Sequence, residues 1–233
     1  MTNDPAQIQA IFNRIAPVYD QLNDLLSLGQ HRIWKQMTVN WSEARPGNTC
    51  LDLCCGSGDL ALLLAKQAGA SGHVFGLDFS AEQLARAQQR NPPILYPSSP
   101  ITWVEGDALN LPFADRYFDC ATMGYGLRNV TDIPRCLQEL HRVLKPGAKA
   151  AILDLHRPSS SLMRSFQQWY LENLVVPVAK QFGMTQEYAY INPSLEKFPT
   201  GAEQIALSRQ AGFAIATHYP IAGAMMGVLV VST

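Results

Sequence analysis

Residues 51–60 read LDLCCGSGDL, an apolar strand that runs directly into a tight glycine turn, with a helix opening behind it. Glycine lets the backbone turn sharply and lets a ligand approach closely, because no Cβ stands in the way. Asp78 follows at the end of a second apolar strand, residues 73–77. An acidic side chain at the tip of that strand can accept hydrogen bonds from a ribose. Together these features predict a pocket for an adenosine-bearing cofactor at the carboxyl edge of a parallel sheet.

Short apolar strands and amphipathic helices alternate through the middle of the chain. We expect strands at 49–53, 73–77, 101–104, 117–123 and 148–155, and helices near 59–68, 80–90 and 131–144. This order implies a parallel sheet with helices on both faces. Two final apolar runs, 213–219 and 225–231, are joined by a short link, which can only connect strands antiparallel. The predicted fold class is α/β, a Rossmann-like sheet of seven strands with a terminal antiparallel hairpin.

The length of 233 residues predicts a single domain. We divide it into an N-terminal helical cap (1–45), a cofactor-binding core (46–155), a helical lid insertion (156–199), and a last helix with the hairpin (200–233). Asp4 and Pro5 are typical of a helix start. Residues 200–203 carry the T-x-x-E pattern of a capping box, which predicts the start of the last helix.

Composition narrows the class of protein. The net charge of −1 provides no basic field to hold nucleic acid. The five cysteines show no metal-ligand spacing, which indicates reduced thiols and no metal. The first residues do not resemble a signal peptide, and the apolar runs fall short of the ~20 residues that span a bilayer. We expect a cytoplasmic protein with enough apolar surface for peripheral membrane contact or a homo-oligomer interface.

The glycine loop alone leaves the cofactor open, because residues 56–61 also satisfy G-x-G-x-x-A, the dinucleotide fingerprint of nicotinamide-dependent dehydrogenases. Three further segments bear on the choice. GDALNLPF at 106–113 follows the third strand, and its Asp107 can accept a hydrogen bond from an adenine amino group. MGYGLRNV at 123–130 ends the fourth strand with small residues beside polar ones, as a ligand cleft requires. RVLKPG at 142–147 closes a helix and leads into the fifth strand.

This ordered set resembles the S-adenosylmethionine-dependent methyltransferases of the seven-stranded Rossmann-like type, and the terminal hairpin does not fit a standard dehydrogenase. The resemblance implies S-adenosyl-L-methionine as the cofactor. It also implies a cofactor-binding set made of Asp52, Gly56, Gly58, Asp78, Asp107, Ala108 and Tyr125. In that family the glycine loop covers the methionine part, the acid after the second strand binds ribose, and the aspartate after the third meets adenine. Many members have glycine where Cys54 stands, so Cys54 must take the turn or point its side chain away.

The N-terminal segment is more specific. YDQLNDLLSLGQHRIW, residues 19–34, looks like the signature of the quinone C-methyltransferases of ubiquinone, menaquinone and phylloquinone biosynthesis, with Leu22 in place of a usual methionine. A second signature near 142–147 departs more, with Ala148, Asp154 and His156 replacing glycine, glutamate and serine. Overall the chain looks most similar to the demethylphylloquinone methyltransferases of oxygenic phototrophs. The resemblance implies a prenylated quinol as the substrate and methylation of 2-phytyl-1,4-naphthoquinol, the last step of phylloquinone biosynthesis.

The chemistry of such a substrate indicates candidate residues. A ring carbon is a poor nucleophile until a neighbouring hydroxyl, a phenol of pKa ~10, loses its proton. His31 is the predicted base, because imidazole titrates near neutral pH. Arg128 and Asn129 are predicted to stabilise the oxygen on which charge develops. The residues predicted to shape the substrate pocket are Tyr19, Asp20, Asn23, Arg32 and His156.

Several alternatives stay open from the sequence. The acceptor could be demethylmenaquinol, a benzoquinol of the ubiquinone or plastoquinone type, or another small molecule. The chain could also be a non-catalytic S-adenosylmethionine-binding subunit of a quinone-biosynthesis complex, and a dehydrogenase would prefer a nicotinamide cofactor. Apolar side chains recur along one side of the helix expected over 160–182, which predicts core packing, a subunit contact, or a lid that meets a membrane.

Overall fold

The structure, a computed structural model, describes residues 14, 27, 29–90, 99–158, 160–184 and 191–233. The helix expected to start at Asp4 and Pro5 lies outside the described residues. So do three of the predicted substrate residues, Tyr19, Asp20 and Asn23.

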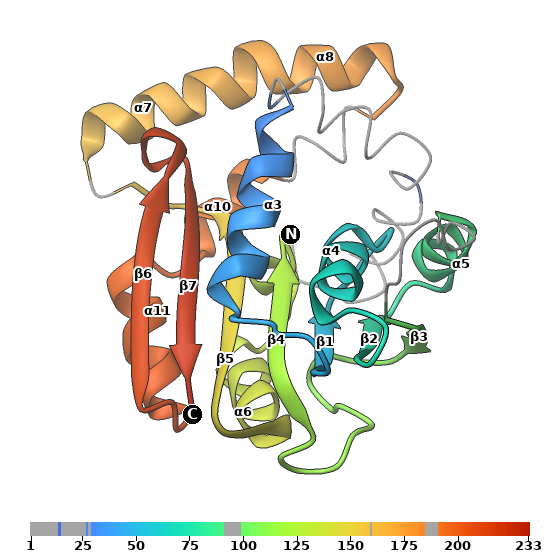
Figure 1. Ribbon diagram of the computed structural model, residues 1–233. Helices are drawn as coiled ribbons and strands as arrows, with labels where there is room; N and C mark the ends of the chain where they lie inside the picture. Colours follow the sequence, from blue (N-terminus) through green and yellow to red (C-terminus); the bar gives the residue numbers. More distant parts are fainter. Residues whose placement is uncertain (1–13, 15–26, 28, 91–98, 159, 185–190) are drawn as a thin grey trace.

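Seven strands form one sheet in the order β3-β2-β1-β4-β5-β7-β6 (Figure 1). The strands are β1 (Thr49–Leu53), β2 (His73–Asp78), β3 (Ile101–Glu105), β4 (Phe118–Gly124), β5 (Leu144–Leu155), β6 (Ile215–Ile221) and β7 (Met226–Ser232). Strands β1 to β5 pair in parallel, whereas β7 is antiparallel to both β5 and β6. The predicted α/β class, the seven strands and the terminal antiparallel hairpin are therefore confirmed. β5 starts earlier than expected, because Leu144 already pairs with Phe118 before a shift in register.

Helices cover both faces and one end of this sheet (Figure 1). The α-helices are α3 (Gln30–Trp41), α4 (Asp59–Ala68), α5 (Ala81–Arg90), α6 (Ile133–Val143), α7 (Ser161–Tyr170), α8 (Val176–Gln181), α10 (Ile191–Lys197) and α11 (Gly201–Gln210). Three short turns of other helix types are η1 (Leu127–Asn129), η2 (Leu171–Val175) and η3 (Ala222–Ala224). The capping box is confirmed, since Glu203 N donates to Thr200 Oγ1 and Thr200 N donates to Glu203 Oε2.

The long helix expected over 160–182 is present, and it contains a π-helical turn in its middle. α7 continues through the π turn η2 into α8, which has Pro177 in its first turn. Proline lacks the N–H that an α-helix would use here, and its ring clashes with the carbonyl four residues earlier. A wider turn just before the proline relieves that clash. In Figure 1 this helix crosses the end of the sheet toward which β4 points.

The core lies on both faces of the sheet. One buried cluster joins the strands to Leu137 and Leu140 of α6 and to Leu195 of α10. A second cluster joins the opposite face to Val39 of α3 and Leu64 of α4. Because the strands are buried on both faces, their carboxyl ends offer the edge where polar groups can meet a ligand. Across the described ranges, no helix reaches the length and hydropathy needed to cross a membrane.

Candidate active site

A cavity of about 390 Å³ opens at the carboxyl ends of β1 to β4. Six of the seven predicted cofactor residues line it, namely Asp52, Gly56, Asp78, Asp107, Ala108 and Tyr125. They come from four separate strand ends, and the parallel order of β3, β2, β1 and β4 brings those ends to one edge. The prediction that the glycine loop, Asp78 and Asp107 share one pocket agrees with this geometry; their roles toward a cofactor stay predictions.

The glycine turn is held by the aspartate of the next strand. Gly56 N donates to Asp78 Oδ2 at 2.8 Å, and Ser80 N donates to Asp78 Oδ1 at 3.0 Å. Burial raises the pKa of Asp78, and these backbone donors partly oppose that rise. Each carboxylate oxygen can accept a second hydrogen bond, so Asp78 can anchor the turn and still receive a ribose hydroxyl.

Gly58 is the predicted residue that does not line the cavity. It caps the start of α4 in the left-handed region, at φ +89°. A Cβ added there would lie 2.6 Å from Cη2 of Trp103 and 3.1 Å from Cβ of Ala87. Its neighbours Ser57 and Asp59 do line the cavity. Gly58 therefore lets the turn pack against Trp103 and shapes the cavity from behind.

Cys54 takes the turn that many relatives make with glycine, because its φ is +55°. Gly126, from the loop after β4, leaves room for it: a Cβ added at Gly126 would lie 2.6 Å from Cβ of Cys54. Burial raises the pKa of the Cys54 and Cys55 thiols well above their ordinary value. Since a thiol reacts as its thiolate, both cysteines act here as small packing groups.

Asp52 supplies a buried acceptor to the cavity. Its Oδ1 accepts from Thr122 Oγ1 at 2.9 Å, and its Oδ2 has no hydrogen-bond partner within the described part of the chain. Burial raises the pKa of Asp52 to about 7. Burying a carboxylate is costly unless a cation or donors compensate for the lost hydration. The carboxylate therefore fits a ligand with a positively charged donor, such as the ammonium group of S-adenosylmethionine.

We expect Asp52 to make the ligand-free protein less stable as the pH rises. Between about pH 4 and the folded pKa of about 7, the folded state holds the proton that the unfolded state has released. Stability contributed by this group therefore falls with pH in that window, by up to about 1.4 kcal/mol per pH unit. Urea unfolding of wild type and Asp52→Asn from pH 4 to 8 measures the effect. The variant should gain on the wild type toward pH 8, and parallel pH profiles would contradict the assignment.

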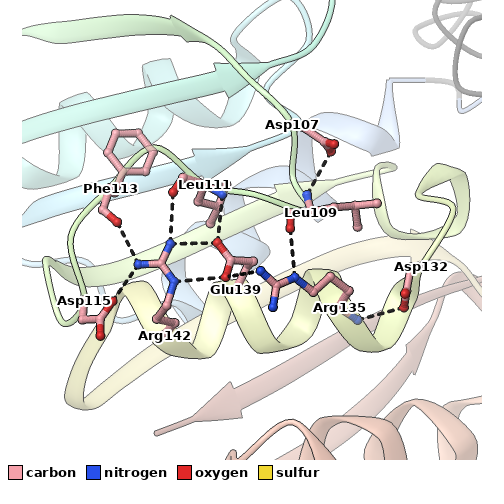
Figure 2. Close-up of polar contacts among 9 residues, drawn as sticks. All are labelled: Asp107, Leu109, Leu111, Phe113, Asp115, Asp132, Arg135, Glu139 and Arg142. Atoms are coloured by element: carbon pink, nitrogen blue, oxygen red, sulfur yellow. Dashed lines mark hydrogen bonds and ion pairs between the residues drawn. The ribbon is translucent and has the colours of Figure 1, made fainter.

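The loop after β3, which carries Asp107 and Ala108, is clamped to α6 (Figure 2). Arg142 of α6 donates to the carbonyls of Leu111 and Phe113, at 3.0 and 2.8 Å. The guanidinium also pairs with Asp115 at 2.7 Å and with the buried Glu139 at 2.7 Å. Together with the backbone bond from Gly106 N to the Asp78 carbonyl at 3.0 Å, these contacts hold the loop whose residues line the cavity.

Two further contacts extend the clamp toward the cavity (Figure 2). Glu139 Oε2 accepts from Leu111 N at 2.8 Å, and Arg135 Nε donates to the carbonyl of Leu109 at 3.1 Å. Leu109 lines the cavity beside Asp107, whose Oδ1 accepts from Leu109 N at 2.9 Å. The RVLKPG segment noted in the sequence thus positions the predicted adenine loop through Arg142.

Asn129 is the predicted catalytic residue that reaches the cavity wall. Its Nδ2 donates to the Tyr125 carbonyl at 2.8 Å, while its buried Oδ1 has no hydrogen-bond partner in the described ranges. Arg128 does not line the cavity. Its Nη1 pairs with Asp154 Oδ1 at 2.6 Å and donates to the Tyr125 carbonyl at 2.9 Å. Arg128 thus supports the strand end that presents Tyr125, and its role toward a substrate oxygen stays a prediction.

The predicted base His31 and the predicted substrate residues Arg32 and His156 are not among the residues that line the cavity. His31 is buried on α3, with Nδ1 2.9 Å from Ser27 Oγ, and Arg32 beside it is exposed. His156, at the end of β5, has its ring 4.9 Å from the ring of His218, and burial lowers its pKa. The structure therefore does not bring His31, Arg32 or His156 together with Asn129 around the described cavity; their roles stay predictions.

Lys35 is a wall residue that the sequence interpretation missed. It lines the cavity together with Asp59, and its ammonium is ion-paired with that carboxylate. A signal was present, because His31, Lys35 and Thr38 recur at helical spacing and all three are buried. A lysine on the buried face of a helix marks a cation that has a partner inside the protein.

A seven-stranded Rossmann-like sheet with its antiparallel end, and an acidic cavity over the carboxyl ends of its strands, define the class of S-adenosylmethionine-dependent methyltransferases. The comparison with solved structures supports the fold. The chain is similar to a SAM-dependent methyltransferase from Aquifex aeolicus, with a TM-score of 0.64 and 18% identity. That match covers 91% of this chain and 96% of the other.

The chain belongs to the ubiE/COQ5 methyltransferase family, whose family model matches residues 1–231. It is similar to a 2-phytyl-1,4-naphtoquinone methyltransferase of Nostoc punctiforme, at 68% identity over 100% of this chain and 99% of the relative. A protein of the same name from Trichormus variabilis is 64% identical over 100% of both chains. The protein is therefore a methyltransferase that uses S-adenosylmethionine.

Proposed function

We propose that this protein methylates a ring carbon of 2-phytyl-1,4-naphthoquinol and so forms phylloquinol. The observation that carries the proposal is the full-length similarity to proteins named for that substrate, at 68% and 64% identity. At such identity over the whole chain, the substrate pocket is expected to be shared along with the fold. A prenylated quinol is accordingly the proposed substrate.

S-adenosylmethionine, when bound, supplies a methyl group on a sulfonium centre. Asp52 would receive the ammonium group of that cofactor, since its Oδ2 is a buried acceptor with no partner in the described structure. Asp78 would bind the ribose hydroxyls, and Asp107 with Ala108 would meet the adenine. On the cavity wall, Asp52, Asp78 and Asp107 suit a cofactor that carries a net positive charge.

The ring carbon becomes nucleophilic when the neighbouring hydroxyl gives up its proton. Asn129 would hold that hydroxyl, because it lines the cavity and its buried Oδ1 is an acceptor with no hydrogen-bond partner among the described residues, while its Nδ2 donates to the Tyr125 carbonyl. Arg128 donates to the same carbonyl and is itself paired with Asp154, which helps to keep the partner of Asn129 in place. His31 remains the proposed base.

The long helix of α7, η2 and α8 is the proposed contact for the apolar tail of the substrate and for a membrane surface. Leu162, Phe166 and Trp169 are exposed and recur at helical spacing, so they share one face. The rings of Phe166 and Trp169 stack, with centroids 6.1 Å apart. Exposed aromatic and aliphatic groups in a row are typical of helices that lie in a membrane interface. A homo-oligomer would use the same face, and sedimentation velocity distinguishes the two.

The test is methyl transfer from radiolabelled S-adenosylmethionine to chemically reduced 2-phytyl-1,4-naphthoquinone. We expect carbon-bound label with the quinol and none with the oxidised quinone, because only the quinol provides an ionisable hydroxyl. Transfer to a benzoquinol and not to the naphthoquinol would move the proposal to another quinone pathway. Cofactor binding without transfer to any quinol would contradict it and favour a non-catalytic subunit.

The same assay tests the apolar helix face when the quinol is presented in lipid vesicles and, separately, in detergent micelles. Phe166→Ser combined with Trp169→Ser should weaken vesicle-dependent transfer by about tenfold or more. The reason is that burying each ring in the lipid contributes at most about 1.5–3 kcal/mol to the free energy of membrane binding. Transfer in micelles should match the wild type. Equal loss in both presentations would argue against a membrane contact.

A further inference from the structure

Lys35 is a buried cation in the cavity wall, and burying a charged side chain requires a compensating interaction. Only 5% of its surface is exposed, and its ammonium is ion-paired with Asp59, the first residue of α4. The ammonium also lies 5.9 Å from the centre of the Tyr125 ring. A lysine is seldom buried without a partner, because burial removes the hydration of its charge. Asp59 is such a partner, but it also forms an ion pair with a second cation.

Asp59 is shared between two cations. Its Oδ1 also pairs with Arg90 Nη2 at 2.5 Å. Burial alone would raise the pKa of Asp59, but the charges of Lys35 and Arg90 hold it below its ordinary value. The carboxylate is therefore ionised and is shared by the two cations. Arg90 has 37% of its side chain exposed and does not line the cavity, whereas Lys35 does. Of these two cations, Lys35 is the one that meets the cavity.

The strand order gives this charge a position relative to a bound nucleoside. Asp107 and Asp78, the predicted adenine and ribose residues, follow β3 and β2. The neighbours of Lys35, Asp59 and Tyr125, follow β1 and β4, on the other side of the cavity in the order β3-β2-β1-β4. A ligand whose adenosine lies over β3 and β2 therefore extends its remaining end toward Lys35.

We propose that Lys35 binds the carboxylate of the amino-acid end of S-adenosylmethionine, with Asp52 on β1 receiving the ammonium group of the same end. A free α-amino acid end carries one anion and one cation. The β1 and β4 side of the wall offers one buried cation and one buried acid with an unpartnered oxygen. A lysine ammonium has three donors, so it can keep Asp59 and add a carboxylate oxygen. The inference rests on the methyl donor of the proposed function and is independent of which quinol is methylated.

Three probes separate the parts of the ligand without relying on turnover. S-adenosylhomocysteine carries both charged groups, its decarboxylated form keeps the ammonium group alone, and 5′-methylthioadenosine has neither. Isothermal titration with wild type and Lys35→Met compares them. We expect the variant to bind S-adenosylhomocysteine about ten- to a hundredfold more weakly, as the loss of a charged hydrogen bond predicts. Its affinity for the decarboxylated form should be unchanged, and Lys35→Arg should recover part of the loss.

Lys145→Met is the matched control. Lys145 is also paired with an aspartate, Asp119, at 2.6 Å, but it lies at the opposite end of the sheet, at the start of β5. The Lys145→Met variant should bind all three probes with the affinity of the wild type. The wild type itself adds a measurement that needs no variant, because it should prefer S-adenosylhomocysteine to the decarboxylated form by a similar factor.

Three outcomes would overturn the inference. Equal losses for S-adenosylhomocysteine and its decarboxylated form would mean that Lys35 only maintains the structure. Unchanged binding of S-adenosylhomocysteine with a raised KM for the quinol would move Lys35 to the substrate. If the wild type binds none of the three probes, the cofactor assignment itself is overturned, and this inference with it. In the first two outcomes the wild type still binds S-adenosylhomocysteine, so the two kinds of failure can be told apart.

Discussion

Gly58→Ala should lower the free energy of unfolding by about 3 kcal/mol, since left-handed backbone and overpacking each cost about 1–2 kcal/mol or more. Gly58 has φ +89°, and a Cβ there would lie 2.6 Å from the ring of Trp103. The same ring also packs on Gly76, where an added Cβ would lie 2.6 Å from it, and this second contact restricts its movement. The glycine turn must shift instead, and the cavity wall beside it shifts too.

Urea unfolding and titration with S-adenosylhomocysteine measure both consequences of Gly58→Ala. We expect weaker binding as well as lower stability, because Ser57 and Asp59 on either side line the cavity. Gly223→Ala is the matched control. Gly223 is also left-handed, at φ +64°, but an added Cβ would meet nothing within 4 Å. That variant should lose about 1 kcal/mol and keep its affinity. Equal destabilisation of the two variants would refute the steric explanation.

Arg142→Met should have an effect of similar size through a different cause. Removing the guanidinium takes hydrogen bonds from the carbonyls of Leu111 and Phe113 and from the buried Glu139. Buried acceptors that lose a charged donor cost about 1–3 kcal/mol each, and solvent access at this partly exposed arginine reduces the total to about 2–4 kcal/mol. The loop that carries Asp107 then loses its fixed position.

The measurement for Arg142→Met is the same pair of unfolding and titration experiments, with 5′-methylthioadenosine added as a probe of the adenosine end. Its affinity should fall with that of S-adenosylhomocysteine, because the loop meets the adenine side of the cavity. Arg45→Met is the control, since Arg45 is exposed and its contact with Glu43 is 3.6 Å long. A surface change of that kind stays within about 0.5 kcal/mol of the wild type. An Arg142 variant that behaves like the control would disprove the clamp.

Much of this fold could be predicted because its signals are local. Glycine at 56, strand-length apolar runs and the capping box at Thr200 each depend on a few neighbouring residues. The strands accordingly lie within a few residues of their expected positions. The antiparallel hairpin was predicted from its short link, but the insertion of β7 between β5 and β6 was not, because it depends on pairing over long sequence distances.

The residues of the site also fall into two groups, those that local sequence patterns predict and those whose place depends on tertiary packing. Asp52, Asp78 and Asp107 were predictable because parallel strands deliver their carboxyl ends to one edge. Lys35 was missed because its place depends on how α3 packs against α4. The role of Arg128 at a substrate oxygen stays a prediction. Its pairing with Asp154, a partner 26 residues later on β5, was not predicted. A pairing of that kind follows from tertiary packing and leaves no spacing pattern in the sequence.

The position of β7 has a consequence for how the protein is made. β6 precedes β7 in the chain but joins the sheet only through it, since β7 pairs with β5 on one side and β6 on the other. Translation proceeds from the N-terminus, so β1 to β5 and then β6 leave the ribosome before β7 does. The five parallel strands can therefore assemble on the ribosome while β6 still has no partner and β5 is still an open edge. The described residues that line the cavity, the last of which is Thr131, are all synthesised before β7 can join β6 to the sheet.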